Sequence, residues 1–296
     1  MNNSIFRGIA TALITPFKAN GDVDYDAYRR LIDWQIESGI DALVTCGTTG
    51  EGPTLSDEEH KLVMRCCVEQ AAGRVPVIAG TGSNDTAYAV ELTKYACEIG
   101  ADAMLVVTPY YNKATQKGLI ESFTKLADIS AKPLILYNVP SRTGCGITPA
   151  TYAALAEHEN ICGIKEANGN ISSVVETMSL VQGKLDMYSG NDDQIVPILS
   201  MGGAGCISVL SNIMPKETCE ITRRWFAGDI AGAAELQMKY LQLINALFCE
   251  VNPIPVKAAM AEMGWCADVL RLPLTPMEAA NREKLFALMR REGLIR

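Results

Sequence analysis

Residues 75–109 read VPVIAGTGSNDTAYAVELTKYACEIGADAMLVVTP, and the two ends of this stretch differ from its middle. Residues 76–82 and 103–109 are apolar on both faces, as strands are when helices cover both sides of a parallel sheet. Residues 86–99 between them carry apolar side chains at helical spacing. The stretch therefore predicts a strand, a helix and a second strand parallel to the first.

The same unit recurs along the chain. We predict strands at residues 8–17, 42–47, 76–82, 103–109, 134–140, 161–167, 185–190 and 205–210. Helical spacing lies between them at residues 25–38, 57–72, 86–99, 116–129, 149–157, 171–181 and 194–201. This repeat predicts a closed (β/α)8 barrel, a TIM barrel, which usually takes about 250 residues. An open doubly wound sheet is the alternative, but it usually carries G-x-G-x-x-G after its first strand, and residues 11–16 read TALITP.

The chain beyond about residue 215 has no convincing strand. Helices are predicted at residues 216–227, 230–249, 255–263 and 276–292, and the first of them can serve as the eighth helix of the barrel. We therefore expect a barrel with the active site over residues 1–228 and a C-terminal helical domain over residues 229–296.

The composition favours a small-molecule ligand. The 296 residues include 34 acidic and 26 basic ones, a net charge of −8. This charge repels phosphate backbones and anionic membranes, so we expect neither nucleic acid nor a membrane as a partner. Ten cysteines with no C-x-x-C pair favour free thiols in a reducing cytosol. Because the N-terminus lacks the charged start and apolar run of a signal peptide, we expect a cytoplasmic location.

Lys165 is the leading candidate for chemistry, because active sites of such barrels lie at the C-terminal ends of the strands. Its strand, residues 161–167, reads ICGIKEA, so the lysine either points into the barrel or reaches solvent at the strand end. If it points inward, desolvation favours the neutral amine, which can attack a ketone or aldehyde and form a Schiff base. Glu166 should face the opposite way. Tyr137 ends the preceding strand and could pass protons to the lysine, or be a half-buried core tyrosine.

Two segments could bind a carboxylate. Residues 47–52 read GTTGEG, a turn in which backbone N–H groups and hydroxyls can surround a small anion, and they lack the lysine of a phosphate loop. Arg142, in the segment 141–144 after the fifth strand, could hold a carboxylate by two hydrogen bonds, although a lone arginine in a loop is more often solvated.

Three further patterns carry less weight. Tyr110 and Tyr111 follow the fourth strand, where packing and catalysis are equally plausible. Residues 190–193 read GNDD and are typical of a helix cap, with a metal site from these acids as the lesser alternative. His60 and His158 are the only histidines, so a three-histidine zinc site is impossible, and neither neighbourhood suggests a Ser-His-Asp triad. We predict no metal.

With residues 8–12 (GIATA), 137–144 (YNVPSRTG), 252–257 (NPIPVK) and 272–273 (LP) in place, the chain resembles the dihydrodipicolinate synthase and N-acetylneuraminate lyase family of class I aldolase-type barrels. The resemblance covers nearly the whole chain. Residues 137–144 are similar to the synthases of the family, whereas the lyases tend to have neither this asparagine nor this arginine.

The resemblance implies a role for each matching residue. Lys165 matches the lysine that forms the Schiff base with pyruvate, and Tyr137 the residue that shuttles protons. Thr48 and Tyr111 match the rest of a hydroxyl relay, with Tyr111 reaching in from a neighbouring subunit. The positions that match substrate-binding residues are Thr49 and Ile207 for pyruvate, Arg142 for the carboxylate region of the aldehyde, and Gly190.

The implied reaction condenses pyruvate with L-aspartate 4-semialdehyde to 4-hydroxy-tetrahydrodipicolinate, for diaminopimelate and lysine synthesis. The implied enzyme is a lyase that needs no metal or organic cofactor and forms a homotetramer, a dimer of dimers. Two alternatives stay open: a related pyruvate-dependent aldolase acting on a sugar acid, and an inactive barrel that only binds a ligand.

The resemblance also bears on regulation. Family members that lysine inhibits bind it at a subunit interface, and His60, Asn84 and Tyr110 fit that effector pattern. Tyr88 stands where sensitive enzymes carry a glutamate for the amino group of lysine, and Asp57 replaces a histidine. We therefore expect weak feedback by lysine.

Overall fold

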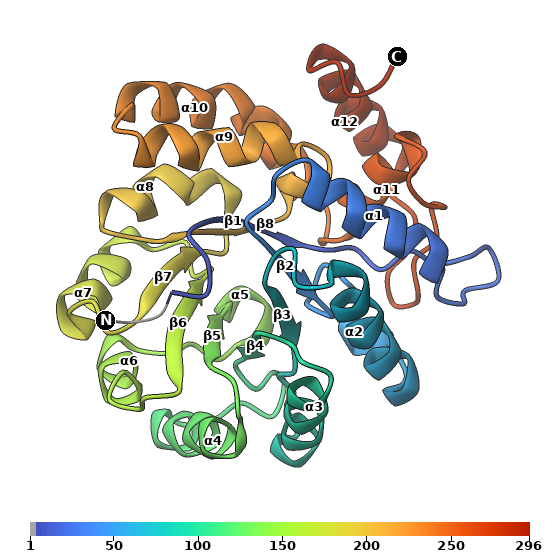
Figure 1. The fold of residues 1–296 in the computed structure, drawn as a ribbon. Coiled ribbons are helices and arrows are strands. Elements are labelled where there is room, and N and C mark those ends of the chain that lie inside the picture. Colours follow the sequence, from blue (N-terminus) through green and yellow to red (C-terminus); the bar gives the residue numbers. More distant parts are fainter. Residues whose placement is uncertain (1–3) are drawn as a thin grey trace.

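The computed structural model describes residues 4–296 and contains the predicted barrel. Eight parallel strands close in sequence order, with β8 beside β1 (Figure 1). They are β1 (Gly8–Ala12), β2 (Ala42–Thr45), β3 (Val77–Gly80), β4 (Ala103–Val107), β5 (Leu134–Asn138), β6 (Ile161–Glu166), β7 (Asp186–Ser189) and β8 (Gly205–Ser208). The predicted fold class and every predicted strand are confirmed.

Helices surround the barrel (Figure 1). Those between or after the strands are α1 (Tyr25–Glu37), α2 (Asp57–Ala71), α3 (Thr86–Glu98), α4 (Gln116–Ile129), α6 (Pro149–Leu155), α7 (Ile171–Val181), α8 (Ile195–Ser200) and α9 (Pro215–Phe226). Short pieces follow several strand ends: η1 (Gly52–Thr54), α5 (Pro140–Thr143), η2 (Asp192–Gln194) and η3 (Leu210–Asn212).

The C-terminal helices lie together on one side of the ring, coloured orange to red in Figure 1. They are α10 (Ile230–Ala246), α11 (Ile254–Glu262) and α12 (Ala279–Arg291). α10 packs against α9 and α12, and α11 packs against α12 and η3. Trp265, just after α11, stacks on Trp34 of α1 with ring centroids 4.5 Å apart. These helices are therefore packed directly onto the barrel.

The local sequence explains where the helices begin and end. Ser56 caps α2 in a capping box: its hydroxyl accepts from the Glu59 N–H, and the Glu59 carboxylate accepts from the Ser56 N–H. Thr148 caps α6 by accepting from the Thr151 N–H. Gly39 follows α1 with φ of +84°, a left-handed conformation that favours glycine.

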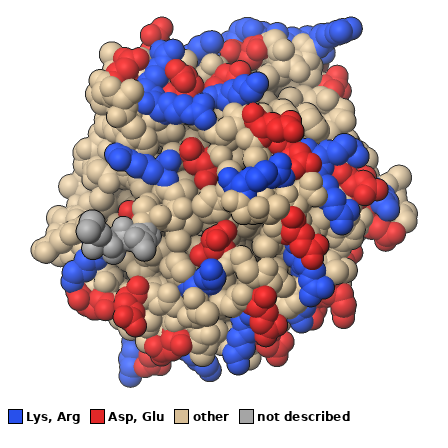
Figure 2. Space-filling view, viewed as in Figure 1, with Lys and Arg blue, Asp and Glu red and all other residues tan. Residues whose placement is uncertain are grey.

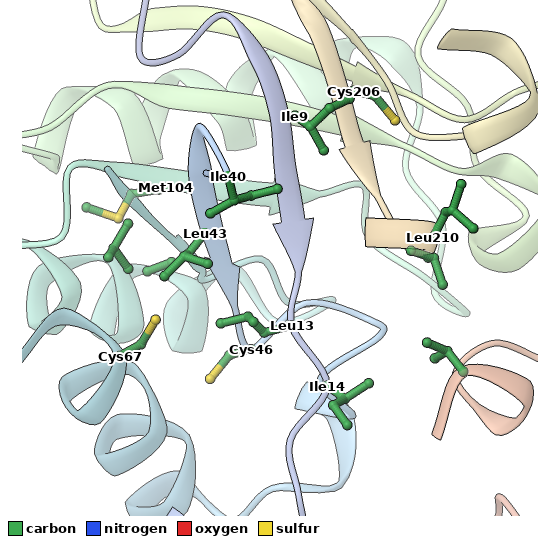
Figure 3. Packing of buried hydrophobic residues seen from close by; sticks show 14 of the residues in the cluster. Ile9, Leu13, Ile14, Ile40, Leu43, Cys46, Cys67, Met104, Cys206 and Leu210 are labelled. Carbon is green, nitrogen blue, oxygen red and sulfur yellow. The ribbon is translucent and has the colours of Figure 1, made fainter. Parts of the chain in front are cut away.

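The apolar strands fill two separate cores. Ile9 of β1 and Leu43 of β2 point outward into the core beneath the helices (Figure 3), whereas their neighbours Ala10 and Val44 line the inside of the barrel. Because consecutive side chains alternate between these buried faces, a strand of such a barrel must be apolar throughout. Phe6 closes the inner core below, and its ring stacks on Tyr188 at 4.2 Å.

Most predicted ends lie within three residues of the observed ones, and two differences go further. The first strand was expected to reach residue 17 but ends at Ala12, and Pro16, which lacks an N–H group, lies in the irregular segment that follows. The segment at residues 141–144 was expected as a loop, but most of it belongs to the short helix α5. This helix starts at Pro140, a residue suited to the first helical position.

The surface gives no sign of a large basic field on the face seen in Figure 2, where acidic and basic side chains are interspersed. Among the helices of residues 4–296, none is long and apolar enough to span a bilayer.

Candidate active site

Lys165 points into the barrel and lies against Tyr137. The two residues are paired in register across β6 and β5. Both are buried, with 6% and 7% of their surface exposed, and the Lys165 Nζ atom lies 4.2 Å from the centroid of the Tyr137 ring. No hydrogen bond joins the two side chains within the described residues, so the amine rests on the ring face beside the phenol.

The outer face of the same strands is held by a buried carboxylate. Glu166 accepts hydrogen bonds from Asn138 Nδ2 at 3.0 and 3.1 Å, from the Tyr152 hydroxyl at 3.0 Å and from the Asn168 N–H at 2.9 Å. Burial raises the pKa of the Glu166 carboxyl, and these donors oppose the rise. Asn138 and Glu166 are the register pair next to Tyr137 and Lys165, so the network fixes where the reactive pair lies.

The turn at residues 47–52 brings two threonines to the same end of the barrel. Thr48 lines the cavity at the mouth, and Thr49 is buried, its hydroxyl accepting from Asn252 Nδ2 at 3.0 Å. The turn is tight, since a Cβ atom on Gly52 would lie 2.5 Å from the Cys46 carbonyl oxygen. Position 52 of the turn therefore requires a glycine.

Arg142 in α5 borders the same cavity, which has a volume of about 370 Å³. Its Nη2 atom donates to the Asn252 carbonyl oxygen at 3.2 Å, and the residue remains exposed at the mouth. The cavity thus joins a hydroxyl, a phenol and a guanidinium from Thr48, Tyr137 and Arg142.

The effector candidates divide. His60 and Tyr110 line the cavity, as does Tyr88, whereas Asn84 does not. His60 Nε2 donates to the Gly80 carbonyl oxygen at 2.9 Å, and burial lowers the pKa of its imidazole. Desolvation and the nearby Asp57 raise the pKa of Tyr88 to about 12.

Several predicted site residues, Lys165 among them, are not part of the lining of this cavity. Ile207 is fully buried in the inner core that also contains Tyr137. Gly190 lies against Lys165, since a Cβ atom there would come within 3.3 Å of the Lys165 Cε atom. Tyr111 is 91% exposed, with a left-handed φ of +69°, and does not reach the site of its own chain.

The prediction of a helix cap at residues 190–193 is wrong. No side chain caps η2 or α8. Asp192 is instead buried and accepts from the backbone N–H groups of Val209 and Leu210, each at 2.9 Å, so it binds the end of β7 to the turn after β8. Within residues 4–296, no group of three or more His, Cys, Asp or Glu residues is arranged to hold a metal ion.

Comparison with known proteins agrees with this geometry. The model of the Dihydrodipicolinate synthetase family matches residues 5–292. The chain belongs to this family. The 4-hydroxy-tetrahydrodipicolinate synthase of Lachnoclostridium phytofermentans is 53% identical to this family member over 99% of the chain and 100% of that protein.

Solved structures of the family superpose closely on this member. The dihydrodipicolinate synthase of Aquifex aeolicus aligns with a TM-score of 0.96 at 45% identity, over 98% of this chain and 99% of that one. The dihydrodipicolinate synthase of Acinetobacter baumannii, crystallised in complex with pyruvate, aligns with a TM-score of 0.95 at 44% identity and the same coverage.

Asn252 has no role predicted from the sequence, although it contacts both Thr49 and Arg142 in this family member. It begins the segment NPIPVK, which was informative as part of the resemblance, yet nothing local connects it to residues 47–52. Only the packing of the C-terminal helices on the barrel brings it there.

Proposed function

We propose that the chain condenses pyruvate with L-aspartate 4-semialdehyde to 4-hydroxy-tetrahydrodipicolinate, a step toward diaminopimelate and lysine. The observation that carries this proposal is the buried amine of Lys165 on the face of Tyr137, a residue that also lines the cavity. Membership of the family supports the same chemistry.

The first stage activates pyruvate. The amine of Lys165 adds to the ketone carbon, and Tyr137 and Thr48 pass protons so that the new hydroxyl leaves as water. The resulting iminium draws electrons from the neighbouring methyl carbon, which loses a proton and becomes an enamine. Because the iminium itself is the electron sink, this route requires no metal ion or organic cofactor.

The second stage joins the two substrates. Arg142 binds the carboxylate of the semialdehyde and directs its aldehyde toward the enamine. A carbon–carbon bond forms, and the aldehyde oxygen takes up a proton. The amino group of the substrate then attacks the imine carbon, closes the ring and releases Lys165 as a free amine.

Trapping with borohydride tests the first stage. Incubation with pyruvate and sodium borohydride should reduce the imine and add a stable adduct to the Lys165 peptide, detected by mass spectrometry. Lys257 is also buried and serves as an internal control that should stay unmodified. An unmodified Lys165 peptide would favour a barrel that only binds a ligand, and the Lys165→Ala variant should lose synthesis altogether.

The aldehyde is tested separately. L-Aspartate 4-semialdehyde as sole acceptor should support turnover, whereas sugar aldehydes should compete poorly. Efficient use of a sugar aldehyde in place of the semialdehyde would identify the alternative, an aldolase acting on a sugar acid.

We also propose that Tyr111 completes the site of a neighbouring subunit in a homotetramer. Its 91% exposure in the single chain supports this role. Mixing Tyr111→Phe chains with Lys165→Ala chains should restore activity, because a mixed pair contains one site with both native residues. Sedimentation at micromolar concentration should show a tetramer, and failure of complementation in a verified mixed oligomer would refute the role in trans.

Weak lysine feedback belongs to the same proposal. Asp57 already accepts a hydrogen bond from Lys61 at 2.7 Å, which leaves its charge partly neutralised. We expect millimolar lysine to leave turnover nearly unchanged, and strong inhibition in that range would contradict this expectation.

The cytoplasm is the proposed location. All ten cysteines are free thiols, and six of them are buried within the part of the chain that is described. Such thiols suit a reducing compartment. Cell fractionation with an antibody against the protein would test the location.

A further inference from the structure

One buried carboxylate connects the turn at residues 47–52, called the threonine turn below, to the C-terminal helices. Glu51 lies in the turn at residues 47–52 and is 2% exposed. Its Oε1 atom accepts from Lys257 Nζ of α11 at 2.5 Å, and its Oε2 atom accepts from the Arg271 N–H at 3.1 Å. Both carboxylate oxygens are thus used by groups that lie more than 200 positions away, as the separations of 206 and 220 residues show.

The partner cation is equally enclosed. Lys257 has no exposed surface and donates a second hydrogen bond, to the Val269 carbonyl oxygen at 2.7 Å. Its Nζ atom also lies 3.9 Å from the centroid of the Phe17 ring. A buried ion pair is seldom more stabilising than a well-packed apolar pair, because both charges lose their hydration. The effect of the Glu51–Lys257 ion pair is therefore better sought in the backbone conformation that it stabilises than in overall stability.

That conformation is the threonine turn itself. Glu51 has a φ of +52°, a left-handed conformation that is unfavourable for a residue with a side chain. Its N–H donates to the Thr48 carbonyl oxygen at 3.1 Å, so the backbone of Glu51 is bonded directly to the residue that presents a hydroxyl to the cavity. A shift of the Glu51 backbone would therefore strain its hydrogen bond to Thr48.

A second connection comes from the same part of the chain. Asn252, shortly before α11, donates to the Thr49 hydroxyl at 3.0 Å. The turn is therefore held from the C-terminal side at adjacent points, once through Thr49 and once through Glu51. On the barrel side the Gly50 carbonyl oxygen accepts from the Thr15 hydroxyl at 2.6 Å.

We propose that Glu51 and Lys257 are positioning residues whose buried ion pair holds Thr48 and Thr49 against pyruvate, which makes the C-terminal helices part of the catalytic apparatus. This inference rests on the proposed function. It differs from a purely structural role because it predicts a defect in one half-reaction: the pyruvate step should suffer, whereas aldehyde binding at Arg142 should not.

The test compares three variants in the full-length protein. Lys257→Met leaves Glu51 buried without its cation, and the double variant Glu51→Gln with Lys257→Met removes both charges. Arg282→Met is the matched control, since it breaks the ion pair with Asp268 in the C-terminal region and contacts nothing in the threonine turn. Melting temperature, steady-state kinetics and the rate of pyruvate adduct formation on Lys165 are measured for each.

In the double variant we expect kcat/KM for pyruvate and the trapping rate to fall at least tenfold, with KM for the aldehyde within twofold of the wild type. Arg282→Met should lower the melting temperature without changing either kinetic constant by more than twofold. If the double variant does not fold, Lys257→Gln, which keeps a hydrogen-bond donor toward Glu51, is judged by the same criteria.

Each outcome decides one question. A folded double variant whose kcat/KM for pyruvate stays within twofold of the wild type overturns the positioning role. The positioning role is also overturned if the double variant and Arg282→Met show the same kinetic defects, and if these defects are as large for the aldehyde as for pyruvate. The ion pair would then contribute only to stability. Absence of any Lys165 adduct in the wild type would instead refute the proposed function.

Discussion

Gly190→Ala tests whether the position of the Lys165 side chain limits activity. An added Cβ atom would lie 2.8 Å from the Ala167 Cβ atom, 3.1 Å from the Glu166 carbonyl oxygen and 3.3 Å from the Lys165 Cε atom. The first of these distances is about 1 Å inside the usual carbon–carbon separation of roughly 3.5–4.0 Å. Overpacking of this kind costs about 1–3 kcal/mol.

The two effects of Gly190→Ala have different magnitudes. At about 2–4 °C per kcal/mol, the overpacking should lower the melting temperature by several degrees. The contact with Lys165 Cε requires the side chain to move by a few tenths of an ångström. Since a misplacement of about 1 Å can cost on the order of 100-fold in rate, we expect kcat/KM for pyruvate to fall by about tenfold.

Calorimetry and a coupled assay at saturating semialdehyde measure both quantities. Gly118→Ala in α4 is the control, because an added Cβ atom there would meet its neighbours at 3.5 and 3.6 Å, ordinary contact distances. It should be neutral or stabilise the helix by up to about 1 kcal/mol. Wild-type activity together with a wild-type melting temperature in Gly190→Ala would refute the reasoning.

Three further predictions concern groups around the same site. Tyr137→Phe should reduce kcat about 10²–10⁴-fold, the usual contribution of a proton-transfer group, and a loss below fivefold in steady-state assays would remove it from the relay. Tyr152→Phe removes a hydrogen bond to the buried Glu166 carboxylate and should cost about 1.5–3 kcal/mol in urea unfolding, with a smaller kinetic effect than Tyr137→Phe; an unchanged unfolding midpoint would contradict this. His60→Gln should flatten the pH dependence of stability. Burial lowers the pKa of His60 below its usual 6.5, so the unfolded chain binds the extra proton first and the free energy of unfolding falls as the pH drops below about 6.5. Parallel stability curves for wild type and variant between pH 7.5 and about pH 5 would rule out this linkage.

Much of the fold was predictable because most strands and helices are determined by residues that lie close together in the sequence. Each strand is bounded by turns, and each long helix carries its own spacing and cap, as Ser56 and Glu59 illustrate for α2. The short α5 was missed because four residues are too few to show a period. The inward direction of Lys165 was not predictable either, since it depends on the register of β6 against β5.

The errors and omissions at the site share one physical cause. Residues 190–193 were expected to cap a helix, but the partners of Asp192, Val209 and Leu210, follow a different strand. Glu51 and Lys257 were both visible in informative motifs, and their contact spans 206 positions. A residue type predicts the chemistry that a side chain can perform. Its contact partner depends on how distant segments of the chain pack in the folded structure.

Closure itself has a consequence for how the chain is made. The second edge of β1 is paired only when Gly8 pairs with Gly205 of β8. The ring of Phe6 can stack on Tyr188 only after β7 has been synthesised. During synthesis one edge of the first strand therefore stays unpaired until β8 has left the ribosome. We expect nascent chains that stop before β8 to bind chaperones, because the free N–H and C=O groups of an unpaired strand edge can pair with another chain and cause aggregation.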